Sequence, residues 1–312
     1  MSLLLLVSGL GLVLLPGLTQ SFGRRLVPSA WSWMILVALT GGTLMIEVGL
    51  LLYAAPTVLQ AIGVPGLAEL CQHMLNALVP GGTILGWIGA GAAVTVSGGI
   101  AIGIVQSRRV AGAVRVESAL GEHHSMSSCD LVVLPMDSAI AVSVAGSPPQ
   151  IVVSDGLVRM LSDDEFAAVI RHETAHLDHR HQRFLTLASA IEHGLWWVPL
   201  IRRSTHALRS GIERWADEEA IAALPGGREY LRRALVKVTS SFVHPALPAF
   251  SGVETLVERL SALQEDRQRP TPLSLGLILV PGSVLGGTGA IGAGAIFAAF
   301  WTFISAAGHC PI

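Results

Sequence analysis

The sequence predicts a multi-pass α-helical membrane protein with an α+β domain inserted between its apolar segments. Three observations predict this fold class. The chain of 312 residues is 51% hydrophobic and only 13% charged, about half the charged fraction of an ordinary soluble domain. Its charges are concentrated in one central segment. Its apolar residues fall into stretches near the length that a bilayer requires.

The charged residues divide the chain into apolar, mixed-charge and apolar parts. Those outside residues 106–270 are Arg24, Arg25, Glu47 and Glu69. We therefore expect three transmembrane helices within residues 1–106, a mixed-charge domain over 107–270, and a fourth helix with a short tail over 271–312. The four helices are expected at about 3–18, 31–53, 84–105 and 285–306. The first stretch lacks a basic start and a cleavage site, which favours a retained helix over a signal peptide.

The positions of the basic residues predict the orientation in the membrane. Residues 56–83 contain no Lys or Arg, whereas Arg24 and Arg25 follow the first apolar stretch. Because basic loops stay in the cytoplasm, we expect a cytoplasmic central domain and extracytoplasmic termini in the cell membrane. Net charge is −2 with no basic patch, so direct nucleic-acid binding has no support.

The three cysteines fall on both sides of this expected topology. Cys129 would be a buried reduced thiol on the cytoplasmic side. Cys71 and Cys310 would lie outside, where the compartment permits oxidation. They could form a disulfide there, or they could be two unrelated thiols.

The central segment reads as strands followed by helices. Strands are expected at 130–135, 139–144 and 150–153, from β-branched runs ended by turn residues. A helix should begin after Ser162, because Ser162-Asp163-Asp164-Glu165 has the pattern of a capping box. Further helices are expected at about 184–197, 205–224, 228–240 and 252–267.

The first of these helices carries the run His172-Glu173-Thr174-Ala175-His176. Histidines four residues apart project from one helix face, one turn apart, so both can bind a single zinc ion. Glu173 would be the catalytic base, because an adjacent carboxylate can accept the proton of a water that attacks a carbonyl. A polar helix face without a metal is the plainer interpretation of the motif.

A catalytic zinc needs a third protein ligand, and Glu213 is the expected one. Asp217 lies four residues further on the same helix face. It would accept a hydrogen bond from the non-ligating ring nitrogen of a zinc histidine. A solvated acidic face is the alternative, since Glu218 and Glu219 follow. His179 is two turns from His172, too far along a straight helix. Glu192 is a weaker alternative, because the position four residues after it is Trp196. The histidines at 181, 193 and 206 are expected at a helix surface or interface.

At this point the sequence resembles gluzincin zinc peptidases, which combine H-E-x-x-H with a downstream E-x-x-x-D. Three apolar helices before the motif and one after it resemble the BlaR/MecR family of membrane metallopeptidases. The stretch from Ile151 through His176 is also similar to the HtpX/CAAX-protease family. The resemblance implies an α+β zincin domain with one Zn²⁺ per chain.

The resemblance has further implications and two departures. It implies an edge strand for substrate pairing, formed by Ala139, Ile140, Ala141, Val142, Ser143 and Val144. It also implies an oxyanion-stabilising residue, for which His206, Tyr230 and His244 are candidates. Signalling members of the family carry a penicillin-binding sensor after the last helix, which this sequence does not show, so direct β-lactam sensing has no support and a separate sensor protein could be a partner. His181 stands where the family often has aspartate.

The expected function is a membrane zinc endopeptidase that cleaves a protein or peptide substrate, such as a transcriptional repressor, at the cytoplasmic membrane face. An HtpX-like quality-control protease is one alternative. A non-catalytic receptor with a protease-like fold is another, although it would have no chemical need for Glu173. A transporter is weaker still, because the apolar helices lack paired ionisable residues.

Overall fold

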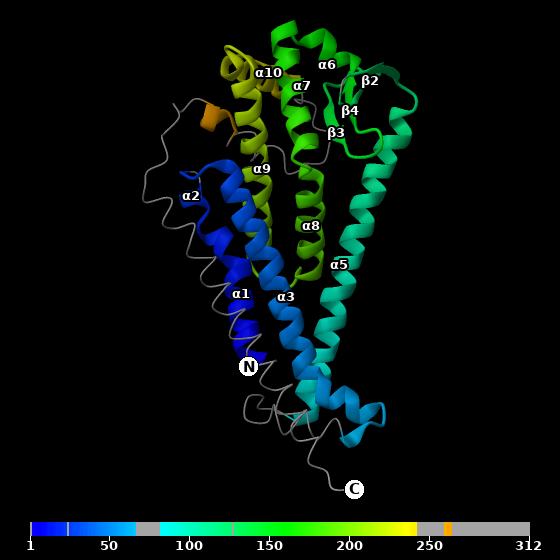
Figure 1. Cartoon of the computed structure of the whole chain (residues 1–312), viewed down its shortest axis with the longest axis vertical. Coiled ribbons are helices and arrows are strands. Elements are labelled where there is room, and N and C mark those ends of the chain that lie inside the picture. The colour runs from blue at the N-terminus through cyan, green and yellow to red at the C-terminus, as the bar shows by residue number, and fades with distance from the viewer. Residues whose placement is uncertain (1, 24, 67–81, 127, 242–258, 264–312) are drawn as a thin grey trace.

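The computed structural model describes residues 2–23, 25–66, 82–126, 128–241 and 259–263. Three long or apolar helices come first in the chain: α1 (Ser2–Leu18), α3 (Pro28–Ala61) and α5 (Gly82–Ser118), with the short α2 (Gln20–Gly23) between the first two. A small sheet lies at one end of these helices, and further helices lie beside and beyond them (Figure 1). The helices are α6 (Asp155–Met160), α7 (Asp163–Asp178), α8 (His181–Gly194), α9 (Ile201–Ala223) and α10 (Gly227–Ser241).

The sheet has four strands in the order β1-β2-β4-β3. The strands are β1 (Glu122–Ser125), β2 (Asp130–Leu134), β3 (Ala141–Val144) and β4 (Gln150–Ser154). β2 and β4 are parallel, and the two outer strands pair antiparallel with them. β4 is buried along its whole length, because it lies inside the sheet and β-branched residues fill both its faces. The domain is therefore helical with a mixed sheet.

The helix that carries the motif begins where the sequence predicts. The Ser162 side chain accepts a hydrogen bond from the Glu165 amide, and the Glu165 carboxylate accepts one from the Ser162 amide. This reciprocal pair satisfies two amides at the start of α7 and confirms the predicted capping box. α7 packs against β3, β4, α9 and α10, so it is held from several sides.

Several helix and strand bounds differ from those expected from the sequence. The helix expected at 31–53 spans Pro28–Ala61, and the one expected at 84–105 continues to Ser118, past the expected domain boundary at 106. Bilayer thickness sets the apolar length but not the helix end, and α5 contains no proline that would interrupt it. The helices expected at 184–197 and 205–224 start earlier, at His181 and Ile201. β1 and α6 were not expected.

The central segment shares a core with the apolar helices. One buried cluster joins Val13, Ile35 and Leu39 of α1 and α3 to Phe184, Ile191, Leu208 and Ile212 of α8 and α9. Figure 1 shows α8 and α9 running beside α1, α3 and α5. Trp196 and Trp197, at the turn between α8 and α9, are exposed.

Two helices in the described part of the chain are long and apolar enough to cross a membrane, by length and composition alone. They are α3 and the Thr83–Ser118 part of α5, while α1 is a shorter apolar helix. The expected helices at 285–306 and at most of 252–267 lie outside the described residues, although 259–263 is helical. Cys71, Cys310 and His244 also lie outside them. Cys129 is buried and free, as predicted, and burial raises the pKa of its thiol.

Candidate metal centre

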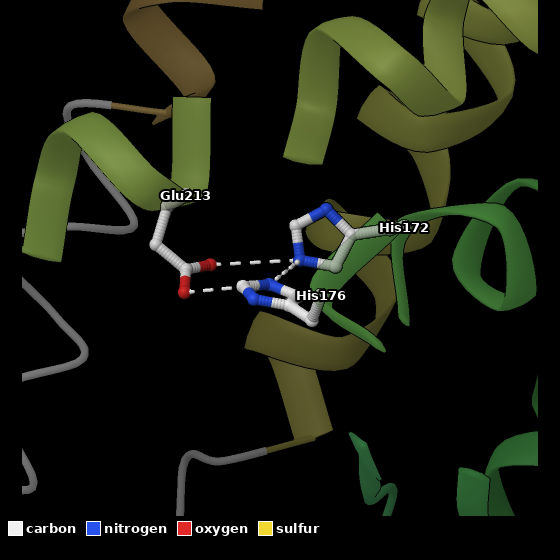
Figure 2. A group of neighbouring side chains, drawn as sticks. All are labelled: His172, His176 and Glu213. Carbon is white, nitrogen blue, oxygen red and sulfur yellow. Dashed lines mark hydrogen bonds and ion pairs between the residues drawn. The ribbon is translucent and has the colours of Figure 1, made fainter. Parts of the chain in front are cut away.

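α7 and α9 bring the three expected metal ligands together. The Nε2 atoms of His172 and His176 are 3.1 Å apart. Glu213 of α9 reaches across with Oε2 at 3.6 Å from His172 Nε2 and Oε1 at 3.7 Å from His176 Nε2. Figure 2 shows the two imidazoles and the carboxylate converging from opposite helices. Both histidines are buried, and Glu213 is partly exposed.

The spacing of these atoms fits a tetrahedral zinc ion. Ligand atoms about 2.0–2.2 Å from zinc lie about 3.3–3.6 Å from one another in a tetrahedron. The observed separations of 3.1, 3.6 and 3.7 Å differ from that edge by a few tenths of an ångström. Two imidazoles and one carboxylate leave the fourth position for a water or a substrate, which is the pattern of a catalytic rather than a structural zinc site.

Asp217 lies one turn beyond Glu213 on α9 and faces the outer nitrogen of His172. Its Oδ1 atom is 2.9 Å from His172 Nδ1, and the residue is only 4% exposed. The alternative of a solvated acidic face is therefore wrong for Asp217. Contact with a carboxylate at Nδ1 leaves Nε2 free to bind a metal and increases the basicity of the ring.

Arg259 completes the charge balance of the centre. Its guanidinium donates to both oxygens of Asp217, at 2.9 and 2.6 Å, and lies 3.1 Å from Oε2 of Glu213. The side chain is 15% exposed. Sequence analysis missed this residue, because it lies 42 positions from Asp217 in a segment without a motif. Its place between the buried Asp217 and the partly exposed Glu213 follows only from the folded chain.

The electrostatics of the centre favour charged carboxylates. Burial opposes ionisation of Glu213 and Asp217, but the Arg259 charge and contacts with His172 lower the pKa of both carboxyl groups. Burial and Arg259 also disfavour protonated His172, yet contact with the two carboxylates raises its pKa to about 9. Burial lowers the pKa of His176. Binding of a metal would thus release a proton from His172, since a ligand nitrogen must be deprotonated.

Glu173 follows His172 on α7 and is partly buried. It lies close enough to His176 and Arg259 to act electrostatically on both. Its role as the base stays a prediction, as do the ligand roles of the histidines and Glu213.

Two of the three oxyanion candidates lie in the described residues. His206 is on α9 two turns before Glu213, about 10 Å along the helix. Its Nδ1 atom lies 3.5 Å from the side-chain amide nitrogen of Gln20. Tyr230 packs at the start of α10 against the apolar cluster of Ala168, Ala220 and Leu231. The oxyanion role of each candidate stays a prediction.

Glu192, the alternative metal ligand, and two further histidines have partners of their own. Glu192 lies 3.0 Å from Arg209 and accepts a hydrogen bond from the Thr205 hydroxyl. His179 contacts Glu219 at 3.2 Å. His193 is partly buried and lies 2.8 Å from the Ser189 carbonyl oxygen.

The expectation of a surface or interface position is wrong for His181, which is 0% exposed and in contact with His176. Burial and the neighbouring histidines lower the pKa of His181 to about 3.

The expected substrate strand is shorter than predicted. β3 comprises Ala141–Val144 and pairs with β4 at one edge of the described sheet. Ala139 and Ile140 precede it. Ala139 is buried in the core, and the Ile140 amide and carbonyl both pair with Ser154, so contact with β4 continues one residue before the strand. Binding of a peptide along β3 stays a prediction.

Comparison with known proteins supports a peptidase domain in this part of the chain. Residues 139–258 match the model of Peptidase family M48. An 82-residue stretch is 32% identical to a protein of Arabidopsis thaliana named Plastoglobule-localized metallopeptidase 48, chloroplastic. That stretch is 26% of this chain and 24% of the relative, so the chain matches about a quarter of the relative's length. No solved structure matches the chain. The family match indicates a metallopeptidase domain, without distinguishing a BlaR/MecR from an HtpX relationship.

Proposed function

We propose that this chain is a membrane-anchored, zinc-dependent endopeptidase that cleaves protein substrates at the cytoplasmic face of the membrane. The observation that carries the proposal is the convergence of His172, His176 and Glu213, whose ligand atoms all lie within 4.8 Å of one another. A metallopeptidase match over residues 139–258 supports the same chemistry independently.

Each residue of the centre would have a separate role in peptide hydrolysis. His172, His176 and Glu213 would hold the zinc ion, and Asp217 would orient His172. Bound zinc supplies a Lewis acid that polarises the substrate carbonyl and acidifies water. Glu173 would accept a proton from the attacking water and pass it to the leaving amine, so that the peptide C–N bond breaks and a carboxylate and an amine form.

The outer faces of the long helices support the membrane anchor. Large apolar side chains project from α3 and α5 along much of their length, including Leu44, Leu51, Ile84, Val94 and Ile102, each more than half exposed. Such a continuous apolar surface favours a lipid environment over water. With the apolar segment at 285–306, the chain would cross the membrane four times.

The position of the centre supports a cytoplasmic active site. The start of α3 and the C-terminal end of α5 lie at the same end of the apolar helices as the sheet and α7 (Figure 1). Basic residues precede α3 in the sequence and occur from Arg108 to Arg115 in α5. Basic residues favour the cytoplasmic side. Arg214, next to Glu213, donates to the Gly23 carbonyl oxygen at 3.4 Å, so the centre lies close to the basic connection between α1 and α3.

A regulatory substrate, such as a repressor protein, is the use we propose for this activity. A separate sensor protein is the source of the activating signal that we propose. Turnover of damaged membrane proteins is the alternative use of the same chemistry.

The activity is tested with the full chain purified in detergent. Wild type should contain about one zinc per chain and cleave itself or casein in a chelator-sensitive manner. Glu173→Gln should keep the zinc and lose about 10²- to 10⁴-fold in cleavage rate. His176→Ala should lose or weaken the zinc. Glu219→Gln, an exposed carboxylate paired with His179, is the matched control and should behave as wild type. Absence of zinc from wild type, or full activity in Glu173→Gln, contradicts the proposal.

A further inference from the structure

His181 has an unusual place for a histidine beside a metal centre. It is the first residue of α8 and has no exposed surface. Its Nδ1 atom lies 3.0 Å from Nδ1 of His176. Aromatic rings surround it, with Trp215 at 4.8 Å and Phe184 at 6.0 Å between ring centroids. The one polar atom that the structure pairs with His181 is therefore the outer nitrogen of an expected metal ligand.

A break in the helix produces this contact. Residues five positions apart on a straight helix point about 140° away from each other, so His176 and His181 would not meet. α7 instead ends at Asp178, and Arg180 adopts a left-handed conformation with φ 53° and ψ 39°. This conformation is rare for arginine. It turns the chain so that the first residue of α8 faces back onto α7.

The contact defines the protons on both rings. His176 Nε2 faces His172 and Glu213, and as a ligand atom it must be unprotonated, so the His176 proton belongs on Nδ1. His181 Nδ1 must then accept that proton's hydrogen bond, which places the proton of neutral His181 on Nε2. This Nε2 atom is buried and has no hydrogen-bond partner in the described structure.

We propose that His181 is a positioning residue of the metal centre, which fixes the ring and the tautomer of His176 through a neutral Nδ1 acceptor. The inference rests on the proposed zinc site. It gives the two ligand histidines unequal partners: His172 contacts the charged Asp217, balanced by Arg259, whereas His176 contacts an uncharged imidazole. Arg259 already balances two carboxylates, Asp217 and Glu213. A neutral imidazole beside His176 adds no further negative charge to this site.

The test compares two substitutions of His181 in the full chain in detergent. His181→Asn places an amide oxygen near the position of Nδ1 and retains the acceptor. His181→Phe keeps the ring and removes the acceptor. His193→Asn is the matched control, because this histidine of the same helix lies 2.8 Å from the Ser189 carbonyl oxygen. Zinc dissociation constants are measured by competition with a chromophoric chelator after removal of the native metal.

We expect His181→Phe to weaken zinc binding by about 10- to 100-fold, with His181→Asn much closer to wild type and the control unchanged. In the cobalt-substituted protein, the exchangeable N–H protons of ligating histidines give shifted proton resonances. His181→Phe should lose solvent protection of one such resonance, which a purely structural residue would not cause.

Wild-type zinc affinity and both protected resonances in a folded His181→Phe variant would overturn the inference. An asparagine variant as weak as the phenylalanine variant would overturn it as well. If His181→Phe does not fold, His181→Asn provides the test. Wild-type zinc affinity and the protected resonance in this variant support the inference, and loss of both overturns it. Failure of wild type to bind zinc would instead refute the proposed function.

Discussion

At the scale of single residues, Arg259 links the stability of the chain to its metal centre. It contacts both Asp217 and Glu213, and all three groups are largely removed from solvent. Two carboxylates in such a site would repel each other and lose hydration. In the metal-free chain, the arginine offsets both the repulsion and the lost hydration. A bound cation would also compensate the negative charge of Glu213.

We therefore expect Arg259→Met to destabilise the metal-free chain by about 3–5 kcal/mol, the cost of leaving a buried charge unpaired. Zinc should reduce this loss, because its charge compensates Glu213. Thermal unfolding in detergent with and without zinc measures both values. Arg159→Met is the control, since its partner Asp137 is fully exposed and such a pair contributes at most about 1 kcal/mol. An equal loss with and without zinc would contradict the expectation.

Glu165 gives a second residue-scale prediction, on pH. The buried carboxylate accepts from Lys237 at 2.6 Å and from the Ser162 amide. Burial opposes its ionisation, but these bonds lower its pKa. A lowered folded-state pKa gives stability that is present above the unfolded value of about 4.3 and is lost as pH falls through the folded value.

Lys237→Met should thus lower the free energy of unfolding by about 1–2 kcal/mol at pH 7. This difference in stability from wild type should shrink below about pH 4. Thermal unfolding across pH checks this. Arg233→Met on the same helix, whose ion pair with Glu229 is exposed, should show a smaller loss. A gap that stays constant down to pH 3 would refute the role of Glu165.

At the scale of elements, the contact between α5 and α8 holds the hairpin of α8 and α9 in place. A Cβ atom at Gly103 would lie 2.7 Å from Cα of Ala190 and 2.9 Å from the Ser189 carbonyl oxygen. The two backbones approach this closely only because Gly103 has no side chain.

Gly103→Ala should lower stability by about 1–3 kcal/mol, because backbone atoms cannot move aside as a flexible side chain would. Gly98→Ala, on the same helix, is the matched control: an added Cβ there meets nothing within 4 Å, so alanine's higher helix propensity should make it neutral or slightly stabilising. Melting temperatures in detergent distinguish the two. Equal behaviour of both variants would refute the close contact as a stabilising feature.

At the scale of the whole molecule, the catalytic segment and the apolar helices form one packed structure. Phe184, Ile191, Leu208 and Ile212 of α8 and α9 are buried against α1, α3 and α5. Separation of the parts would expose this apolar face, at about 25 cal/mol for each Å². We therefore expect that a cut at the predicted boundary, residue 106, would not give two units that fold independently.

Removal of residues 1–106 should yield a fragment that aggregates or needs detergent and has lost wild-type zinc affinity. Size-exclusion chromatography with metal analysis is the measurement. The full chain in the same detergent is the reference. A monomeric fragment that binds zinc in detergent-free buffer would show instead that the catalytic segment folds by itself.

The sequence alone was sufficient for features that depend on neighbours along the chain. Helical spacing places His172 and His176 on one face, as it does Glu213 and Asp217. The capping box locates the start of α7, and apolar length locates α3 and α5, though not their ends. These features are local because side-chain spacing and helix capping extend over only a few residues.

Only the tertiary structure decided the features that depend on long-range packing. It brought α9 to α7, placed Arg259 between two carboxylates, and turned His181 onto His176 through the left-handed Arg180. It also placed α8 and α9 against the apolar helices. Such contacts join residues far apart in sequence or across a break in a helix, where no periodic pattern extends, so their pairing depends on how the whole core packs.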